Sequence, residues 1–210
     1  MDFSVWLAFL AASTALLLIP GPTVLLVLAY ALGEGRRVAV PTALGVAAGD
    51  LIAMSLSLLG LGALVLASAT AFVVLKWIGA VYLVWLGVRM IRGAGHGPAH
   101  YARPPGGLAP RAAFANAAVV TALNPKSIAF FIAFVPQFID PGAVFWPQAA
   151  IFIGTFVVLA GVNALAYALA ATRLRGVMAR PGVLVWVTRA GGATLIAMGA
   201  ATAALRRTTA

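Results

Sequence analysis

Long apolar runs fill this chain, and charged side chains stand almost only in the short gaps between them. Hydrophobic residues make up 63% of the 210 residues and charged residues only 9%. Soluble domains are about half apolar and about a quarter charged, so a soluble domain of this length would lack the charges to cover its surface. Because one membrane-spanning helix needs about 20 apolar residues, the chain predicts an all-α polytopic membrane protein with little outside the bilayer.

The formal net charge of +10 does not indicate nucleic-acid binding. Basic residues of a nucleic-acid-binding protein gather on a solvated face, whereas these lie between apolar runs, where they set membrane topology. The absence of cysteine excludes disulfides, thiolate metal sites and thiol relays. His96 and His100 lie in a segment rich in glycine and proline, which we interpret as a solvated linker. We therefore expect no metal and no cofactor.

The apolar runs predict six transmembrane helices. The first run is too long for the core of a signal peptide and lacks a basic segment before it, so we interpret it as a retained span. The predicted spans cover approximately residues 3–32, two helices within 38–90 that turn near 60–70, and then 112–138, 144–171 and 184–205. The expected domain organisation is a first three-helix repeat at 1–92, a linker at 93–110 and a second three-helix repeat at 111–210.

Prolines interrupt the first and the fourth predicted spans. The first contains Pro20-Gly21-Pro22 and the fourth contains Asn124-Pro125-Lys126. Each proline removes a backbone donor and breaks or kinks a helix. The third and sixth spans also match, since Gly79, Leu83 and Gly87 recur in the same register as Gly191, Leu195 and Gly199.

These matches predict an inverted repeat of three plus three helices, with helices one and four broken. An odd number of spans per unit makes the two units enter the membrane from opposite sides. Paired helix breaks in such repeats indicate a transporter's binding site. The other interpretation is that glycines and kinks are simply common in membrane helices.

Arginines predict the orientation, because positive residues favour the cytoplasmic side. They place the first, third and fifth loops in the cytoplasm and both chain ends on the other side. Arg206 and Arg207 are an exception, because they favour a cytoplasmic C-terminus. The arginines of those loops are Arg36, Arg37, Arg92, Arg103, Arg111, Arg173, Arg175 and Arg180.

Counting from these arginines places both breaks and two charges at one depth. The distance along the chain to a loop arginine is 14 residues for Pro22, 13 for Asp50 and 15 for Lys126. At about 1.5 Å per residue this is roughly 20 Å, near the middle of the bilayer. A charge there is costly and faces either a partner or an aqueous cavity.

Asp50 and Lys126 each have two interpretations. Asp50 follows Gly45-x-x-x-Gly49, a small-residue face for close helix packing. Its carboxylate either carries a proton or meets a substrate ammonium, or else forms a structural ion pair with Lys126. Lys126 either attracts a substrate carboxylate or neutralises Asp50.

The other candidate residues are polar groups and helix breakers. Asn124 binds freed backbone or ligand, or only caps a helix. Asn163, in the fifth span, is interpreted mainly as an interhelical hydrogen-bond donor. Pro20, Gly21 and Pro22 are interpreted as a hinge and a backbone opening rather than as side-chain ligands. Lys76 and Arg189 lie nearer helix ends, where their side chains can reach the interface.

Four segments of the chain together resemble the LysE/RhtB family of amino-acid exporters over nearly the whole length. They are Pro20-Gly21-Pro22, Gly45…Gly49-Asp50, Lys76-x-x-Gly79-Ala80-x-Tyr82-Leu83-x-x-x-Gly87, and Asn124-Pro125-Lys126…Phe130-Phe131…Phe134-x-Pro136-Gln137-Phe138. The resemblance implies a multi-pass protein of the bacterial inner membrane that exports amino acids, as a proton-driven secondary carrier. A midplane site with Lys126, Asp50 and opened backbone suits a zwitterion, and alternating access would rock one three-helix unit against the other.

Other functions stay open to different degrees. An intramembrane enzyme is disfavoured because the sequence lacks H-E-x-x-H and G-x-S-x-G and no histidine lies in a span, so no catalytic residue is predicted. An exporter of another small metabolite, a passive channel and an assembly subunit remain alternatives. No P-loop is present, so coupling to an ion gradient is expected, and the short chain makes a homodimer plausible.

Overall fold

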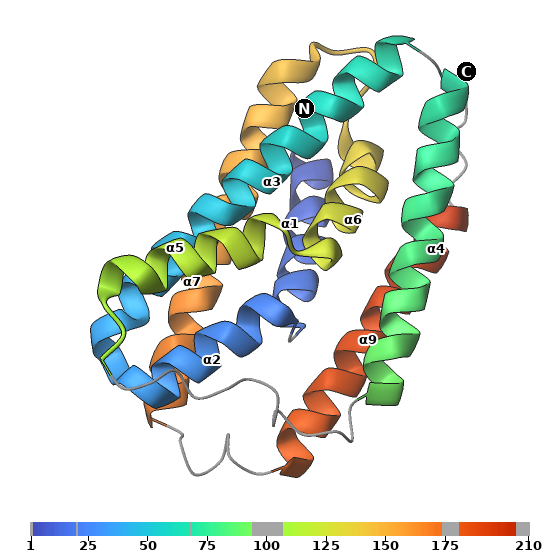
Figure 1. Cartoon of the computed structure of the whole chain (residues 1–210). Helices are drawn as coiled ribbons and strands as arrows, with labels where there is room; N and C mark the ends of the chain where they lie inside the picture. Colours follow the sequence, from blue (N-terminus) through green and yellow to red (C-terminus); the bar gives the residue numbers. More distant parts are fainter. Residues whose placement is uncertain (1, 20, 68, 94–106, 174–180, 205–210) are drawn as a thin grey trace.

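The computed structural model describes residues 2–19, 21–67, 69–93, 107–173 and 181–204 (Figure 1). Every regular element in these residues is helical, which confirms the predicted all-α class. The elements are α1 (Phe3–Leu18), α2 (Pro22–Glu34), η1 (Gly35–Val38), α3 (Ala39–Ala67), α4 (Ala69–Gly93), α5 (Pro110–Ala122), α6 (Pro125–Ala133), η2 (Val135–Phe138), α7 (Phe145–Arg173) and α9 (Pro181–Ala204).

Two bent helix pairs form where the prolines predicted them. The axes of α1 and α2 differ by 57°, and those of α5 and α6 by 45°. Pro22 and Pro125 are the first residues of α2 and α6, a position where proline fits because its missing N–H has no helical partner. Pro20, His96 and His100 and nearly all of the predicted linker lie outside the described residues.

Two described helices, Gly35–Gly60 and Phe145–Ala171, are long and apolar enough to cross a membrane. Counting each bent pair as one span raises this number to as many as four among the described residues. The chain passes from α3 to α4 between Ala67 and Ala69, within the predicted turn region. The count of six spans and the inverted repeat stay predictions.

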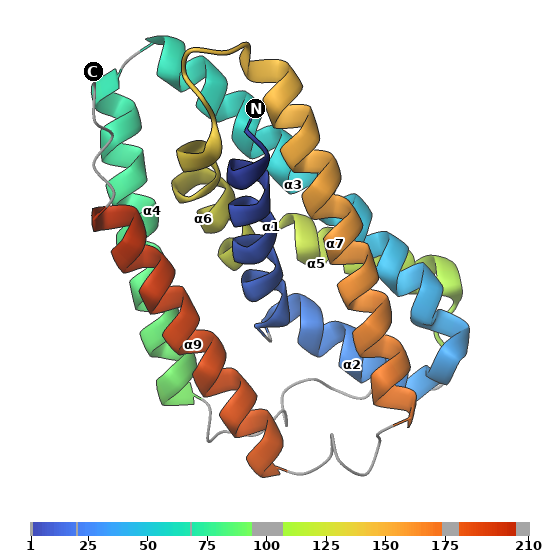
Figure 2. The same ribbon diagram turned by 180° about the vertical axis from the view of Figure 1, so that it is seen from behind.

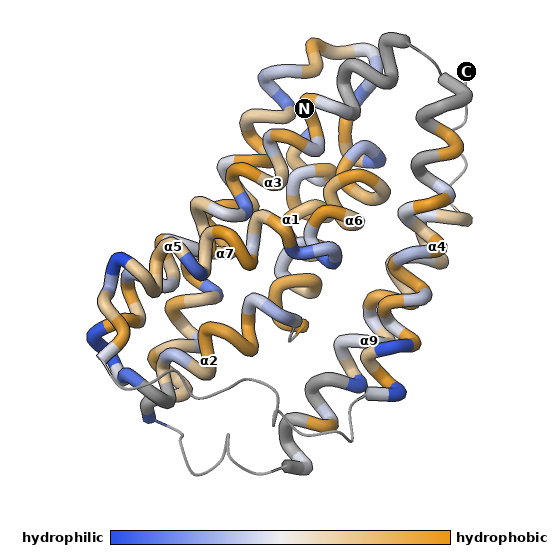
Figure 3. Tube along the Cα trace, viewed as in Figure 1, coloured by the Kyte–Doolittle hydropathy of each residue, from blue (hydrophilic) through white to orange (hydrophobic). Residues whose placement is uncertain are grey.

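The outer surface of the helices carries large apolar side chains. Leu56 of α3 and Val158 of α7 are 64% and 65% exposed. Figure 3 shows apolar positions along most of the helices, with hydrophilic stretches at several helix ends. A soluble monomer rarely exposes so much contiguous apolar surface, whereas lipid tails would cover it.

Helices from the two halves of the chain interleave. α3 packs along α5 and α7, and α4 packs along α9 and α6, so the longest contacts join the first half to the second. In Figures 1 and 2, α4 and α9 lie side by side at one edge, with α1 and α6 between them and the remaining helices. One half of each broken helix, α1 and α6, therefore lies at the centre of the molecule.

The predicted small-residue face of α3 packs against α5. A Cβ atom added to Gly45 would collide with the carbonyl oxygen of Phe114, and one added to Gly49 would lie 2.5 Å from that of Ala118. Because only glycine allows this approach, α3 and α5 meet backbone to backbone. This contact carries Asp50, the residue after Gly49, toward the bend between α5 and α6.

A cluster of aromatic rings fixes α6 against α1 and α7. The ring centroids of Phe9 and Phe152 are 4.6 Å apart, and those of Phe131 and Phe156 are 4.8 Å apart in an edge-to-face arrangement. All four side chains are fully buried. Such pairs add stability beyond the area they bury, so the short helix α6 has a defined position.

Candidate functional site

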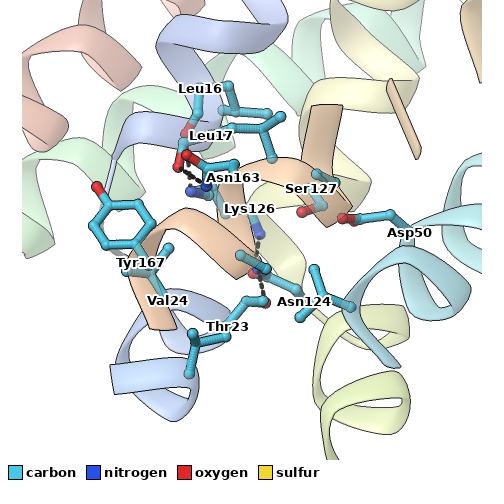
Figure 4. Close-up of a pocket in the computed structure, with 14 residues that line it drawn as sticks. Leu16, Leu17, Thr23, Val24, Asp50, Asn124, Lys126, Ser127, Asn163 and Tyr167 are labelled. Carbon is cyan, nitrogen blue, oxygen red and sulfur yellow. Dashed lines mark hydrogen bonds between the residues drawn. The ribbon is translucent and has the colours of Figure 1, made fainter. Parts of the chain in front are cut away.

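A small cavity lies where both helix bends meet α3 and α7 (Figure 4). Its volume is about 20 Å³, on the order of the space that one water molecule needs. The wall combines apolar residues with a few polar ones, and the ten residues labelled in Figure 4 are Leu16, Leu17, Thr23, Val24, Asp50, Asn124, Lys126, Ser127, Asn163 and Tyr167.

Leu16 and Leu17, in the last turn of α1, line one wall of the cavity. We call the backbone carbonyls of residues 16–19, in this turn and at the C-cap that follows it, the carbonyl end of α1. The last four carbonyls of a helix have no partner within it. Here the Lys126 ammonium donates to two of them, with Nζ 3.1 Å from the Leu16 oxygen and 2.9 Å from the Ile19 oxygen. The lysine is only 5% exposed, so these carbonyls replace its water.

Two side chains of α7 bind the other carbonyls of the same turn. Asn163 Nδ2 donates to the Leu17 carbonyl at 3.0 Å, and the Tyr167 hydroxyl donates to the Leu18 carbonyl at 2.9 Å. Asn163 thus makes the interhelical hydrogen bond that its place in an apolar helix predicted. All carbonyls at the carbonyl end of α1 are therefore held by side chains from other helices.

Asp50 faces the same cavity from α3. It is 2% exposed, and its Oδ1 atom has no hydrogen-bond partner among the described residues. The carboxylate points toward Ser127, whose hydroxyl interacts with it (Figure 4). The Lys126 charge acts on Asp50 across the cavity, but the lysine donates to carbonyls rather than forming a direct ion pair with Asp50. A buried carboxylate with an unpartnered oxygen is costly, which marks it as a functional candidate.

Asn124 joins the two bends. Its Oδ1 atom accepts from the backbone N–H of Lys126 at 3.1 Å and so caps α6. Its Nδ2 atom donates to the hydroxyl of Thr23, in the first turn of α2, at 3.0 Å. The Thr23 hydroxyl in turn lies 3.3 Å from that of Thr121 on α5. The start of α2 and the start of α6 are thereby held together.

Gly21 completes the wall beside Lys126. A Cβ atom there would lie 3.4 Å from both Nζ and Cε of the lysine, in van der Waals contact. Gly21 is also the N-cap of α2, where no side chain caps the helix. Pro22 and Pro125 are exposed and begin their helices, so they shape the bends without entering the cavity.

Five of the sequence-predicted residues thus line or border one cavity, namely Gly21, Asp50, Asn124, Lys126 and Asn163. Arg189 is exposed on α9, and the side chain of Lys76 lies outside what the structure describes. Sequence reasoning missed Thr23, Ser127 and Tyr167. Tyr167 follows Asn163 by four residues on one helix, and that spacing was a usable signal because it puts both on one face.

This arrangement offers groups of both charges in one buried space. Lys126 supplies a cation, Asp50 supplies a carboxylate with an open oxygen, and the helix ends supply backbone carbonyls and N–H groups. A ligand that carries one positive and one negative group can match all of them. The site contains parts suited to binding rather than to bond cleavage.

Comparison with known proteins identifies the family. The family model described as LysE type translocator matches residues 14–205. The chain belongs to this family. The resemblance predicted from the four sequence segments is therefore confirmed, and the translocator family is one of transporters rather than of enzymes.

Two curated relatives match this LysE-type translocator over nearly its full length, and a third matches over part of it. A Salmonella typhimurium protein named homoserine/homoserine lactone efflux protein is 35% identical over 209 residues, 98% of this chain and 99% of its own. An uncharacterized membrane protein of Vibrio cholerae is 33% identical over 199 residues, 95% of this chain and 96% of its own. A leucine efflux protein of Enterobacter is 33% identical over 135 residues, 61% of this chain and 60% of its own. No solved structure matches significantly.

Proposed function

We propose that this LysE-type translocator exports amino acids or close derivatives across the bacterial inner membrane. Relatives named for the efflux of homoserine, homoserine lactone and leucine support this substrate class. The structural observation that supports the proposal most strongly is the buried cavity that Asp50 and Lys126 share between two broken helices. Broken helices with opened backbone are the usual way in which transporters bind ions and zwitterions near the middle of the membrane.

The charges of the cavity suit an amino acid. Lys126 would attract the substrate carboxylate, and Asp50 would either meet its ammonium group or carry a proton. The apolar part of the wall includes Leu16, Val24 and Val46. The uncapped N-terminus of α2 beside Gly21 adds favourable backbone dipoles for a carboxylate. The side chain of the substrate would lie against the apolar part of the wall.

The size of the cavity favours a carrier over an open channel. A space for about one water molecule admits an amino acid only if helices move apart. Alternating access provides this motion around a central site. The packing favours α4 and α9 moving as one body, because they contact each other closely and meet α6, α3 and α1 through smaller contacts.

The proposal includes coupling to protons, with Asp50 as the proton carrier, and loops one, three and five in the cytoplasm. It retains the inverted repeat of three plus three helices as the basis of alternating access. A homodimer is compatible with the exposed apolar surface of α3, where Leu44, Ile52 and Leu56 are exposed, but lipids would cover this surface equally well.

Efflux of labelled amino acids tests the proposal. Cells with and without this gene are loaded with a panel of dipeptides, and the release of each amino acid is followed at imposed pH gradients. We expect selective release that depends on the gene and stops when the gradient is collapsed. Release that depends on the gene but not on the gradient would remove proton coupling. No release of any amino acid, from protein shown to reside in the membrane, would redirect the search to other small metabolites.

A further inference from the structure

The position of the Lys126 ammonium is unexpected for a buried lysine. A carboxylate with an unpartnered oxygen, Asp50, faces the same cavity, and a direct ion pair is the common arrangement for such charges inside a membrane protein. The ammonium instead donates to the backbone carbonyls of Leu16 and Ile19. The lysine ammonium therefore occupies a cation-binding site made of backbone carbonyls instead of pairing with the Asp50 carboxylate.

The carbonyl end of α1 has the properties of a site for an ammonium group. It is the negative end of a helix dipole, at a point where the chain bends away, and the Leu16 oxygen there accepts the backbone N–H of Ile19 as well as the ammonium. Two of the oxygens bind one ammonium at 3.1 and 2.9 Å. Asn163 and Tyr167 hold the two carbonyls between them, which fixes the turn and keeps the Leu16 and Ile19 oxygens directed at one point.

We propose that the carbonyl end of α1 is the site for the ammonium group of the transported amino acid. In the absence of substrate, the ammonium group of Lys126 occupies this site. Substrate binding exchanges one ammonium for another, so the carbonyls keep a cationic partner throughout. The released Lys126 then pairs with the substrate carboxylate, and Asp50 remains free to carry the proton. This inference rests on the proposed function, because it requires a substrate that carries an ammonium group.

The surroundings of Lys126 are compatible with this movement. Gly21 places no side chain beside Nζ, and Asp50 and Ser127 lie on the other side of the cavity. Asn163 and Tyr167 are positioning residues in this scheme, since they orient the carbonyl site without binding the ammonium themselves. Release of Lys126 also frees the end of α1 from α6, which links substrate binding to helix motion.

The first test asks whether removal of the lysine opens the site to a free ammonium ion. The Lys126→Met variant keeps an unbranched side chain that is one atom shorter and lacks the ammonium group. Thermal unfolding of purified wild type and variant is followed in detergent with methylammonium, with tetramethylammonium, which cannot donate hydrogen bonds, and with acetate. We expect methylammonium at ten times its dissociation constant to raise the unfolding midpoint of the variant by about 3 °C, and that of the wild type far less.

The controls separate the outcomes. An equal rise with tetramethylammonium or acetate would overturn the proposal, because the effect would then not depend on donation to carbonyls. No response of the folded variant to methylammonium, alongside normal amino-acid efflux by the wild type, would also overturn it and leave the proposed function standing. Absence of efflux by the wild type would instead count against the proposed function.

A second measurement uses the unaltered chain and does not depend on the folding of a variant. The sequence contains only two lysines, Lys76 and Lys126, so protein labelled with ¹³C at lysine Cε gives two resonances. The Lys76→Arg variant assigns them. We expect the Lys126 resonance to shift when the exported amino acid is added and to stay in place with its N-acetyl derivative, which lacks the ammonium group. A Lys126 resonance that ignores a substrate shown to bind would refute the exchange.

Discussion

Lys126 on α6 binds the backbone carbonyl of Ile19 just beyond the end of α1, with its Nζ atom 2.9 Å from the oxygen. This contact joins two segments 107 residues apart and places a cation at the negative end of a helix dipole. It ties the two broken helices to each other at the point where the candidate cavity lies.

Tyr167→Phe tests the contribution of the carbonyl end of α1 to stability. The change deletes one hydroxyl and its hydrogen bond to the Leu18 carbonyl without altering the ring. We expect the free energy of unfolding to fall by about 1 kcal/mol. Tyr82→Phe is the matched control, because the half-buried Tyr82 has a ring contact with Trp85 and its hydroxyl forms no hydrogen bond with a described residue. Equal stability losses in the two variants, measured by unfolding in detergent, would contradict the assignment.

Asp50→Asn separates function from folding. The substitution keeps the shape of the side chain and removes a buried charge that has an unpartnered oxygen, so the unfolding midpoint should not fall. Efflux driven by an imposed pH gradient should be lost if Asp50 carries the proton. Asp2→Asn is the control, since asparagine caps a helix as well as aspartate does at the exposed start of α1. Full pH-driven efflux by Asp50→Asn would eliminate Asp50 as the proton carrier.

Several features of the site were predictable because single residue types dictate them. Proline cannot continue a helix, so the bends at Pro22 and Pro125 followed directly from the sequence. Counting along helices from the loop arginines placed Asp50 and Lys126 at one depth, and the structure brings both to one cavity. Gly45 and Gly49 predicted close packing, although not that α5 would be the partner.

The partners of these residues were not predictable. Lys126 binds backbone carbonyls, which every residue possesses, so no side-chain type identifies them in the sequence. A direct ion pair between Lys126 and Asp50 was one of the interpretations that charge alone allowed. Tyr167 resembled any aromatic residue in an apolar helix, because only the bend of α1 brings a carbonyl to its hydroxyl. The interleaving of the two halves depends on tertiary packing that a single sequence does not reveal.

Gly49→Ala tests the backbone contact between α3 and α5. The added methyl group would lie 2.5 Å from the carbonyl oxygen of Ala118, so one helix must shift. We expect a loss of about 1–3 kcal/mol in the free energy of unfolding. Gly154→Ala on α7 is the control, because an added Cβ meets nothing within 4 Å there, and alanine favours a helix over glycine. A neutral Gly49→Ala would show that α3 and α5 pack less closely than described.

Asn124→Ser tests the connection between the two bends. Serine keeps an oxygen that can cap α6 and adds no buried charge, but it lacks the amide that donates to the hydroxyl of Thr23. Asn124→Ala removes both interactions. We therefore expect Asn124→Ala to lose about 1 kcal/mol more than Asn124→Ser in the free energy of unfolding. The Thr23→Val background should reduce the difference between asparagine and serine, and an unchanged difference in this double-mutant cycle would rule out the connection.

The predicted orientation in the membrane can be tested because the natural chain has no cysteine. Single cysteines are placed at Gly97 and Val177, in the predicted third and fifth loops, and at Ala143, which is exposed between η2 and α7. A membrane-impermeant maleimide added to intact spheroplasts should label only Ala143→Cys, because the arginine-rich loops are predicted to face the cytoplasm. Lysis should make all three reactive. Labelling of Gly97→Cys or Val177→Cys before lysis would reverse the orientation, and with it the direction from which the substrate reaches the cavity.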